Sequence, residues 1–255
     1  MAFTAARAAL TMALITAGIA PLPAATDGQP EGCPAGSTVQ VLERDQTSAT
    51  GPWPAAAAPA PVGGESPDYR HRLSPTPLGW PTRPHWCVWV EPASGDGPAA
   101  RWDRAWLQSV EAALASWGEL VPITRVASPE QAQVRILRRR PPLRGGRASH
   151  GRAELALVLV QREQRQPELE PQVQVSLGPG QRPAALQATA LHELGHAFGL
   201  WGHSDDRRDA MAAVPGPIPV QQLSPRDRAT FQWLQLQPGL RPAAPRPPVP
   251  GAPTP

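Results

Sequence analysis

The order of hydrophobic and polar positions predicts regular structure between about residues 80 and 240. Four apolar runs are short enough to be β-strands, at 86–90, 134–137, 155–160 and 173–177. The run at 155–160 is apolar throughout, which is typical of a buried strand. The run at 173–177 alternates apolar and polar residues, which predicts a half-buried or edge strand.

Helical periodicity is found between and after these strands. Apolar residues recur at helical spacing between Trp102 and Trp117, which predicts an amphipathic helix of about five turns with a tryptophan stripe in the core. A second helix is expected at 183–198 and should end at Gly199. A third should begin at 224–227, where serine, proline and an acidic residue stand in capping order. Strands and helices in this order indicate an α+β domain.

The flanking segments have a different composition. The chain has 255 residues with 35 prolines and 22 glycines, and many of the prolines lie outside the periodic region. Such stretches bury too little apolar surface to offset the entropy of ordering. We therefore expect one folded domain at 80–240, preceded at 26–79 by a linker or pro-segment and followed at 241–255 by a disordered tail.

Residues 1–25 have the pattern of a secretory signal. A single charge at Arg7 precedes an apolar run that closes on small residues. The alternatives are an uncleaved membrane anchor and a disordered N-terminus. No later segment is apolar enough to span a membrane, so we expect an exported protein, either extracellular or in the cell envelope (periplasm).

Cysteine count and charge add little to this picture. Cys33 and Cys87 form either one disulfide or two unpaired thiols, and no CxxC metal motif occurs. The net charge is +3, and all 24 basic residues are arginines that are interleaved with acids. The densest run, at 138–140, is either a nucleic-acid patch or a solvated strand end. We favour the strand end and expect no nucleic-acid partner.

The helix at 183–198 carries a pattern with metal chemistry. His192 and His196 are four residues apart, so their imidazoles lie on one face of the helix. Zinc binds imidazole nitrogens, and it lowers the pKa of a bound water to about 7. Glu193 follows the first histidine and can reach that water without binding the metal. This HExxH arrangement predicts a glutamate general base beside a zinc ion.

A catalytic zinc site needs a third protein ligand and one open position. Gly199 allows the chain to leave the helix and turn back, which can bring His203 to the metal. Met211 follows eight residues later. The predicted metal ligands are therefore His192, His196 and His203, for one catalytic zinc ion.

The stretch His-Glu-Leu-Gly-His-Ala-Phe-Gly-Leu-Trp-Gly-His-Ser with Met211 resembles the metzincin clan of zinc proteases, and within it the matrixin-like peptidases. It is most similar to a bacterial group, well represented in cyanobacteria, with the site HELGHALGIWGHS. Ser204 fits a matrixin trait. The resemblance spans about residues 80–240, and its specific part is 189–211. It implies a small twisted mixed sheet with an edge strand over the cleft, a long backing helix, the zinc helix, a methionine turn and a C-terminal helix.

The chain departs from the common metzincin pattern in three respects. The usual spacing is HExxHxxGxxH, whereas His203 falls one place later, as in the bacterial group; Asp205 is the alternative third ligand. Ala212 follows the methionine where a tyrosine is common. No matrixin cysteine switch is visible, since Cys33 stands in Glu-Gly-Cys-Pro. The resemblance therefore does not extend to latency through a thiolate.

These residues predict a zinc-dependent metalloendopeptidase that hydrolyses a polypeptide substrate, with Glu193 as general base. The resemblance implies that the substrate lies along the 173–177 strand and extends the sheet. The competing prediction is a catalytically silent, secreted, zinc-containing binding module. A proline-rich envelope protein with a chance motif would bind no stoichiometric zinc. Oligomeric state and cleavage specificity do not follow from the sequence.

Overall fold

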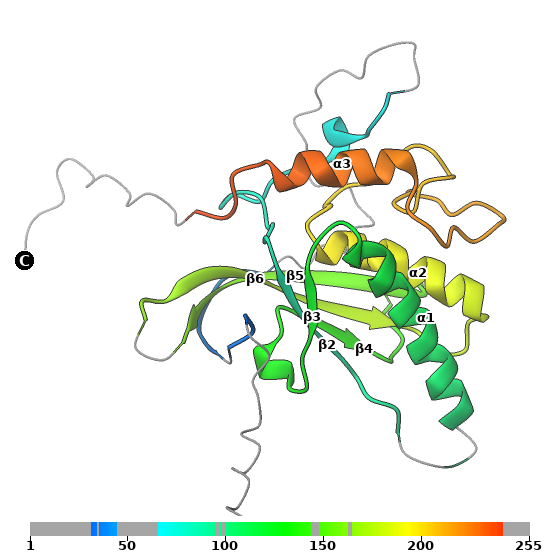
Figure 1. Ribbon diagram of the computed structural model, residues 1–255, viewed down its shortest axis with the longest axis horizontal. Helices are drawn as coiled ribbons and strands as arrows, with labels where there is room; N and C mark the ends of the chain where they lie inside the picture. The colour runs from blue at the N-terminus through cyan, green and yellow to red at the C-terminus, as the bar shows by residue number, and fades with distance from the viewer. Residues whose placement is uncertain are drawn as a thin grey trace, which may run out of the picture.

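The computed structural model describes residues 32–34, 36–44, 66–94, 97, 100–143, 148–162 and 165–241. These residues form an α+β fold with one mixed six-stranded sheet and three α-helices (Figure 1). The predicted signal at 1–25 and the tail beyond Arg241 lie outside the described residues. No helix among the described residues is long and apolar enough to span a membrane.

The elements lie close to the positions that the hydrophobic pattern predicts. The strands are β1 (Ser37–Arg44), β2 (Trp86–Val90), β3 (Ile123–Arg125), β4 (Val134–Leu137), β5 (Gly151–Gln161) and β6 (Glu168–Leu177). The α-helices are α1 (Ala100–Gly118), α2 (Pro183–Ala197) and α3 (Pro225–Gln235), and short 3-10 turns stand at η1 (Arg70–Arg72) and η2 (Pro129–Gln131). The positions of β1 and β3 were not predicted.

The strand order in the sheet is β1-β5-β6-β4-β2-β3. β2, β3, β4 and β6 run parallel, whereas β5 is antiparallel to β6 and to β1. The prediction that 173–177 is an edge strand is therefore wrong. β6 pairs with β4 on one side and with β5 on the other, so its backbone cannot also pair with a substrate. Its alternation reflects one buried face and not a free edge.

Helices α1 and α2 pack together against one face of the sheet, and α3 lies beyond α2 (Figure 1). The core between them contains Trp117, whose indole contacts the rings of Phe198 and Phe231 at centroid distances of 5.9 and 5.2 Å. Trp106 is buried as predicted. Trp102 is the exception in the tryptophan stripe: it stands in the first turn of α1 and is 63% exposed.

The segment expected as linker or pro-segment contributes to the fold. β1 extends the sheet beyond β5, and Cys33 forms a disulfide with Cys87 of β2. This disulfide lies in a small second core with Val126. Tyr69 is fully buried in the main core. The folded region therefore begins well before residue 80, because a disulfide and a buried aromatic ring attach the preceding segment to the sheet.

Candidate metal centre

The last two turns of α2 bring two imidazoles together with their rings nearly perpendicular, at a centroid distance of 4.8 Å. Nδ1 of His192 lies 2.8 Å from the carbonyl oxygen of Ala210, and Nδ1 of His196 lies 2.7 Å from that of Leu200. A carbonyl only accepts hydrogen bonds, so each Nδ1 carries the proton and each Nε2 carries a lone pair. The two Nε2 atoms are 3.2 Å apart. Two lone pairs at this distance have no hydrogen between them and are arranged to share a cation.

The third histidine arrives from the loop that follows α2. The ligand atoms of His192, His196 and His203 all lie within 4.8 Å of one another. Gly199 has a φ of +111°, which lets the chain reverse at the end of the helix. At Gly202, a β-carbon would lie 2.2 Å from the carbonyl oxygen of Arg72. The longer Trp-Gly-His spacing therefore fits a loop that passes close to the 3-10 turn η1.

Glu193 stands beside this histidine group with only 8% of its surface exposed. A β-carbon on Gly151 would lie 2.9 Å from its Oε1 atom, so this carboxylate contacts the first residue of β5. Burial raises the pKa of Glu193 to about 8, although the Ala153 backbone donates a hydrogen bond and Arg152 contributes positive charge. Without a neighbouring cation this group would be mostly protonated at pH 7, and a metal ion bound by the histidines would lower its pKa and favour the carboxylate that acts as a base.

Burial also lowers the pKa of each histidine. The pKa of His203 is lowered to about 4, mainly by burial and in addition by the charge of His192. The pKa of His196 falls well below its ordinary value because of burial and of the other two histidines. All three imidazoles are therefore neutral at pH 7, which is the state that binds a metal ion.

Met211 lies directly against α2 at Gly195, one residue before His196. A β-carbon on Gly195 would stand 2.2 Å from the sulfur of Met211 and 3.0 Å from the indole of Trp117. Glycine is therefore the residue that lets the methionine reach the helix. The backbone amide of Ser204 donates to the Met211 carbonyl at 2.8 Å, which places the methionine turn next to the loop that carries His203.

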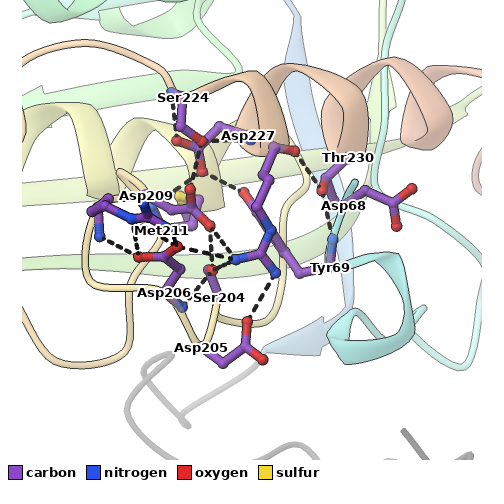
Figure 2. A network of polar contacts seen from close by, with 12 residues as sticks. Asp68, Tyr69, Ser204, Asp205, Asp206, Asp209, Met211, Ser224, Asp227 and Thr230 are labelled. Carbon is purple, nitrogen blue, oxygen red and sulfur yellow. Dashed lines mark hydrogen bonds and ion pairs between the residues drawn. The ribbon is translucent and has the colours of Figure 1, made fainter. Parts of the chain in front are cut away.

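A buried polar network holds this turn in place (Figure 2). The Ser204 hydroxyl donates to Asp209, and the Ser224 hydroxyl donates to the other carboxylate oxygen of Asp209 at 2.6 Å. Arg226 forms an ion pair with Asp209 at 3.0 Å. The residue after the third histidine is thereby connected to the start of α3.

Asp227 is the centre of a second part of the network. Its carboxylate accepts the amides of Ala210 and Ser224, at 2.8 and 2.9 Å, and the hydroxyl of Tyr69 at 2.7 Å. The Ser224 hydroxyl in turn caps α3 by accepting the Asp227 amide. The predicted capping box is present, and its acidic residue also holds the methionine turn.

The arrangement fits a single metal ion with three protein ligands. No fourth His, Cys, Asp or Glu joins this histidine group within the described ranges. Asp205, the alternative third ligand, instead forms ion pairs with Arg72 and Arg226. The other cluster with suitable donors contains Cys33, His85 and Cys87, but its two sulfurs are joined in the disulfide.

Sequence reasoning identified the histidines, Glu193 and Met211, but it missed the side chains that support them. The sequence indicates Asp227 only as part of a helix cap, and it indicates Asp209 only as a neighbour of Met211. Tyr69 carried no periodic signal, because it stands in a proline-rich stretch. These residues act through contacts that are distant in sequence, such as the 158 positions between Tyr69 and Asp227.

Comparisons with known proteins add no family to this description. No protein-family model matches the chain, and no curated protein matches it.

Proposed function

We propose that the protein is a zinc-dependent metalloendopeptidase. The observation that carries the proposal is the pair of imidazole Nε2 atoms that lie 3.2 Å apart, with a third imidazole and the Glu193 carboxyl group beside them. Three neutral histidines without a fourth protein ligand are typical of catalytic and not of structural zinc. The resemblance of 189–211 to metzincins supports the same conclusion.

Zinc bound by His192, His196 and His203 would supply Lewis-acid chemistry that activates water and polarises a carbonyl group. Glu193 would take a proton from the attacking water and deliver it to the amine that leaves. Its buried position beside Gly151 would keep the carboxylate at one orientation. The carbonyl oxygens of Ala210 and Leu200 would keep two imidazoles in the binding tautomer.

The proposed peptide-binding edge is on β5, in place of the 173–177 segment of β6 that the sequence predicts. β1 pairs with β5 only between Ala156 and Gln161, so no described strand pairs with the outer side of 151–155. Gly151 and Ala153 in that stretch both contact Glu193. An extended substrate would add to this edge through main-chain hydrogen bonds, with its bond to be cleaved near Glu193.

The competing proposal is a secreted zinc-containing binding module without activity. A structural zinc site has no role for a buried carboxylate beside an open coordination position. The placement of Glu193 therefore favours the enzyme. Export to the cell envelope or beyond is part of the proposal, and the disulfide is in keeping with it, since disulfides persist in oxidising compartments.

The test uses the full chain, because residues before 80 belong to the fold. Zinc per chain would be measured by elemental analysis, and cleavage of unfolded casein would be followed with and without a chelator. We expect one zinc per chain and cleavage that the chelator abolishes. Glu193→Gln should retain zinc and lose at least about 100-fold in rate, since general-base catalysis contributes on that order.

Glu111→Gln is the matched control, because Glu111 is an exposed residue of α1 that pairs with Arg125. It should retain zinc and full activity. Bound zinc without cleavage of any unfolded protein would favour the binding module. If no zinc is bound, and if His203→Ala does not change the stability of the fold in the presence of zinc, both the peptidase and the binding module are refuted.

A further inference from the structure

A second group of metal-ligating side chains surrounds the disulfide. Cys33, His85 and Cys87 each offer one ligand atom, and these atoms lie within 4.8 Å of one another. Cys33 stands in the segment before β1, His85 directly precedes β2, and Cys87 belongs to β2. None of the three belongs to the histidine group of α2 and its loop. Two sulfurs and an imidazole that meet at one point therefore need an explanation of their own.

The imidazole of His85 is held in an orientation that suits a ligand. Its Nε2 atom lies 2.8 Å from the hydroxyl oxygen of Thr124, which is opposite Cys87 in the pairing of β2 with β3. When Nε2 donates this hydrogen bond, Nδ1 carries the lone pair. A β-carbon on Gly32, the residue before Cys33, would lie 3.4 Å from Nδ1. The lone pair therefore faces the segment that carries Cys33, while a hydrogen bond fixes the ring from behind, as is usual for histidines that bind metals.

The surroundings of the two sulfurs favour a site without net charge. Cys33 and Cys87 are buried in a small core with Val126 and Ala132. Free thiolates would be strongly disfavoured there, because burial penalises a charge that nothing compensates. One divalent ion compensates two thiolates, so two sulfurs, a neutral imidazole and zinc together carry no net charge. His85 is only half-buried, which leaves the metal an approach from solvent.

We propose that reduction of the disulfide converts this group into a second zinc site, with Cys33, His85 and Cys87 as its protein ligands. The sulfur–sulfur bond accepts two electrons from a dithiol, which itself becomes a disulfide, and the two protons of the dithiol pass to the cysteine sulfurs. Zinc then displaces both protons and binds two thiolates and Nδ1 of His85. The donor set selects the metal, since thiolate and imidazole ligands are typical of zinc. The proposal does not depend on peptidase activity.

The exchange of one link for the other requires little movement. The Cα atoms of Cys33 and Cys87 are 5.8 Å apart. Two sulfurs on a tetrahedral zinc ion are about 3.8 Å apart, because each zinc–sulfur bond is about 2.3 Å long. Rotation of the two side chains brings the sulfurs to that spacing while the strands stay in place. Zinc would thus replace the disulfide as the link between the segment before β1 and β2.

The first experiment counts zinc in a full chain that carries His192→Ala and His196→Ala, so that the other histidine group no longer binds metal. The reductant is a phosphine, because a dithiol would compete for zinc, and unbound zinc is removed by gel filtration before elemental analysis. The reduced chain should retain one zinc ion and the oxidised chain none. Adding Cys33→Ala and Cys87→Ala should abolish retention. Equal zinc in the reduced and oxidised chains, or retention without the cysteines, would overturn the proposal.

A second measurement leaves the other histidine group intact and uses cobalt(II) in place of zinc. A thiolate bound to cobalt absorbs in the near ultraviolet, and a site made only of histidines does not produce this band. The reduced wild type should show the band and the oxidised wild type should not.

His85→Ala tests the imidazole ligand in the reduced chain. It should weaken zinc binding at the cysteines at least about 100-fold, more than the loss of a supporting hydrogen bond usually costs. His71→Ala is the matched control, because His71 is also half-buried and belongs to neither metal group, and it should bind zinc like the wild type. A reduced chain without the thiolate band, or unchanged zinc affinity in His85→Ala, would refute the site and leave the proposed peptidase unaffected.

Discussion

Gly195 illustrates how one residue connects the motif to the core. In an exposed helix interior, replacing glycine with alanine stabilises by up to about 1 kcal/mol. At Gly195 the added carbon would lie 2.2 Å from the Met211 sulfur and 3.0 Å from Trp117. Because of these contacts, replacing Gly195 with alanine should destabilise the fold, whereas the same change in an exposed helix stabilises it.

We expect Gly195→Ala to lower the free energy of unfolding by about 1–3 kcal/mol, the usual cost of overpacking a core. Displacement of Met211 should also weaken zinc binding. Urea denaturation and a zinc titration measure the two effects. Gly118→Ala is the control, because nothing lies within 4 Å of a β-carbon at that end of α1. Equal stability of the two variants would refute the packing role of Gly195.

Asp227 is the second residue whose effect exceeds its local role. Asp227→Asn should cost on the order of 3 kcal/mol in unfolding free energy, because buried donors from Ala210, Ser224 and Tyr69 lose a charged acceptor. Asp206→Asn, in the loop that precedes Met211, is the matched control. Its partner Arg208 is exposed, so its loss should cost less than about 1 kcal/mol. Thermal or urea unfolding distinguishes the two.

At the scale of elements, two ion pairs to one buried carboxylate connect three strands of the sheet. Glu170 on β6 is only 1% exposed and pairs with Arg162, just after β5, and with Arg83, just before β2. Burial opposes ionisation of Glu170, but the hydrogen bond from Arg162 and the charges of both arginines outweigh it. Its pKa is therefore below the ordinary value of 4.5.

A carboxyl group with a lowered pKa stabilises the fold above its unfolded-state pKa and loses that contribution as pH falls through the folded-state value. Glu170→Gln should therefore cost about 3 kcal/mol at pH 7, since it removes the buried carboxylate that the two half-buried arginines share. The difference from wild type should shrink below about pH 4.5. Glu168→Gln is the control on the same strand, because the Glu168 side chain is 60% exposed. In urea titrations across pH it should show neither the loss of stability at pH 7 nor the change below about pH 4.5.

The limits of sequence reasoning are also clear at this scale. β2 and β4 lie where their apolar runs predict, and α2 ends one residue before the prediction, because strong periodicity and a terminal glycine fix such elements locally. β1 carries a weak signal: Val41 and Leu42 are 45% and 40% exposed, and the strand exists through its pairing with β5. Strand order is set by long-range pairing, so the edge position of 173–177 could not be tested from its own residues.

The same distinction holds for the candidate site. His192, Glu193 and His196 could be placed by helix geometry alone, and His203 by the glycine that precedes its loop. Asp209, Asp227 and Tyr69 could not be, because their contacts depend on how α3 and η1 meet the methionine turn. A short motif thus predicts the histidines that converge better than it predicts the residues that hold the motif in place.

At the scale of the whole molecule, the disulfide joins Cys33, just before β1, to β2, the fifth of the six strands in sheet order, across 54 residues of chain. In the chain-entropy description, a loop of this length stabilises the fold by about 4 kcal/mol. Reduction should therefore lower the melting temperature by several degrees, measured by calorimetry with and without reductant. A Cys33→Ala/Cys87→Ala variant should melt like the reduced protein and ignore the reductant. No shift on reduction would show that the disulfide adds no stability.

The hydrogen bond between Tyr69 and Asp227 also has a consequence for when the metal centre forms. It joins residues 158 positions apart, with all three histidines between them. Contacts with such long sequence separation form slowly, since a large loop must close first. Helix α2 can be helical early, but the turn that contains Met211 gains its support only when both ends of the domain have met. Metal capture should therefore coincide with the last step of folding, and a partly folded chain would carry the histidines without a competent site.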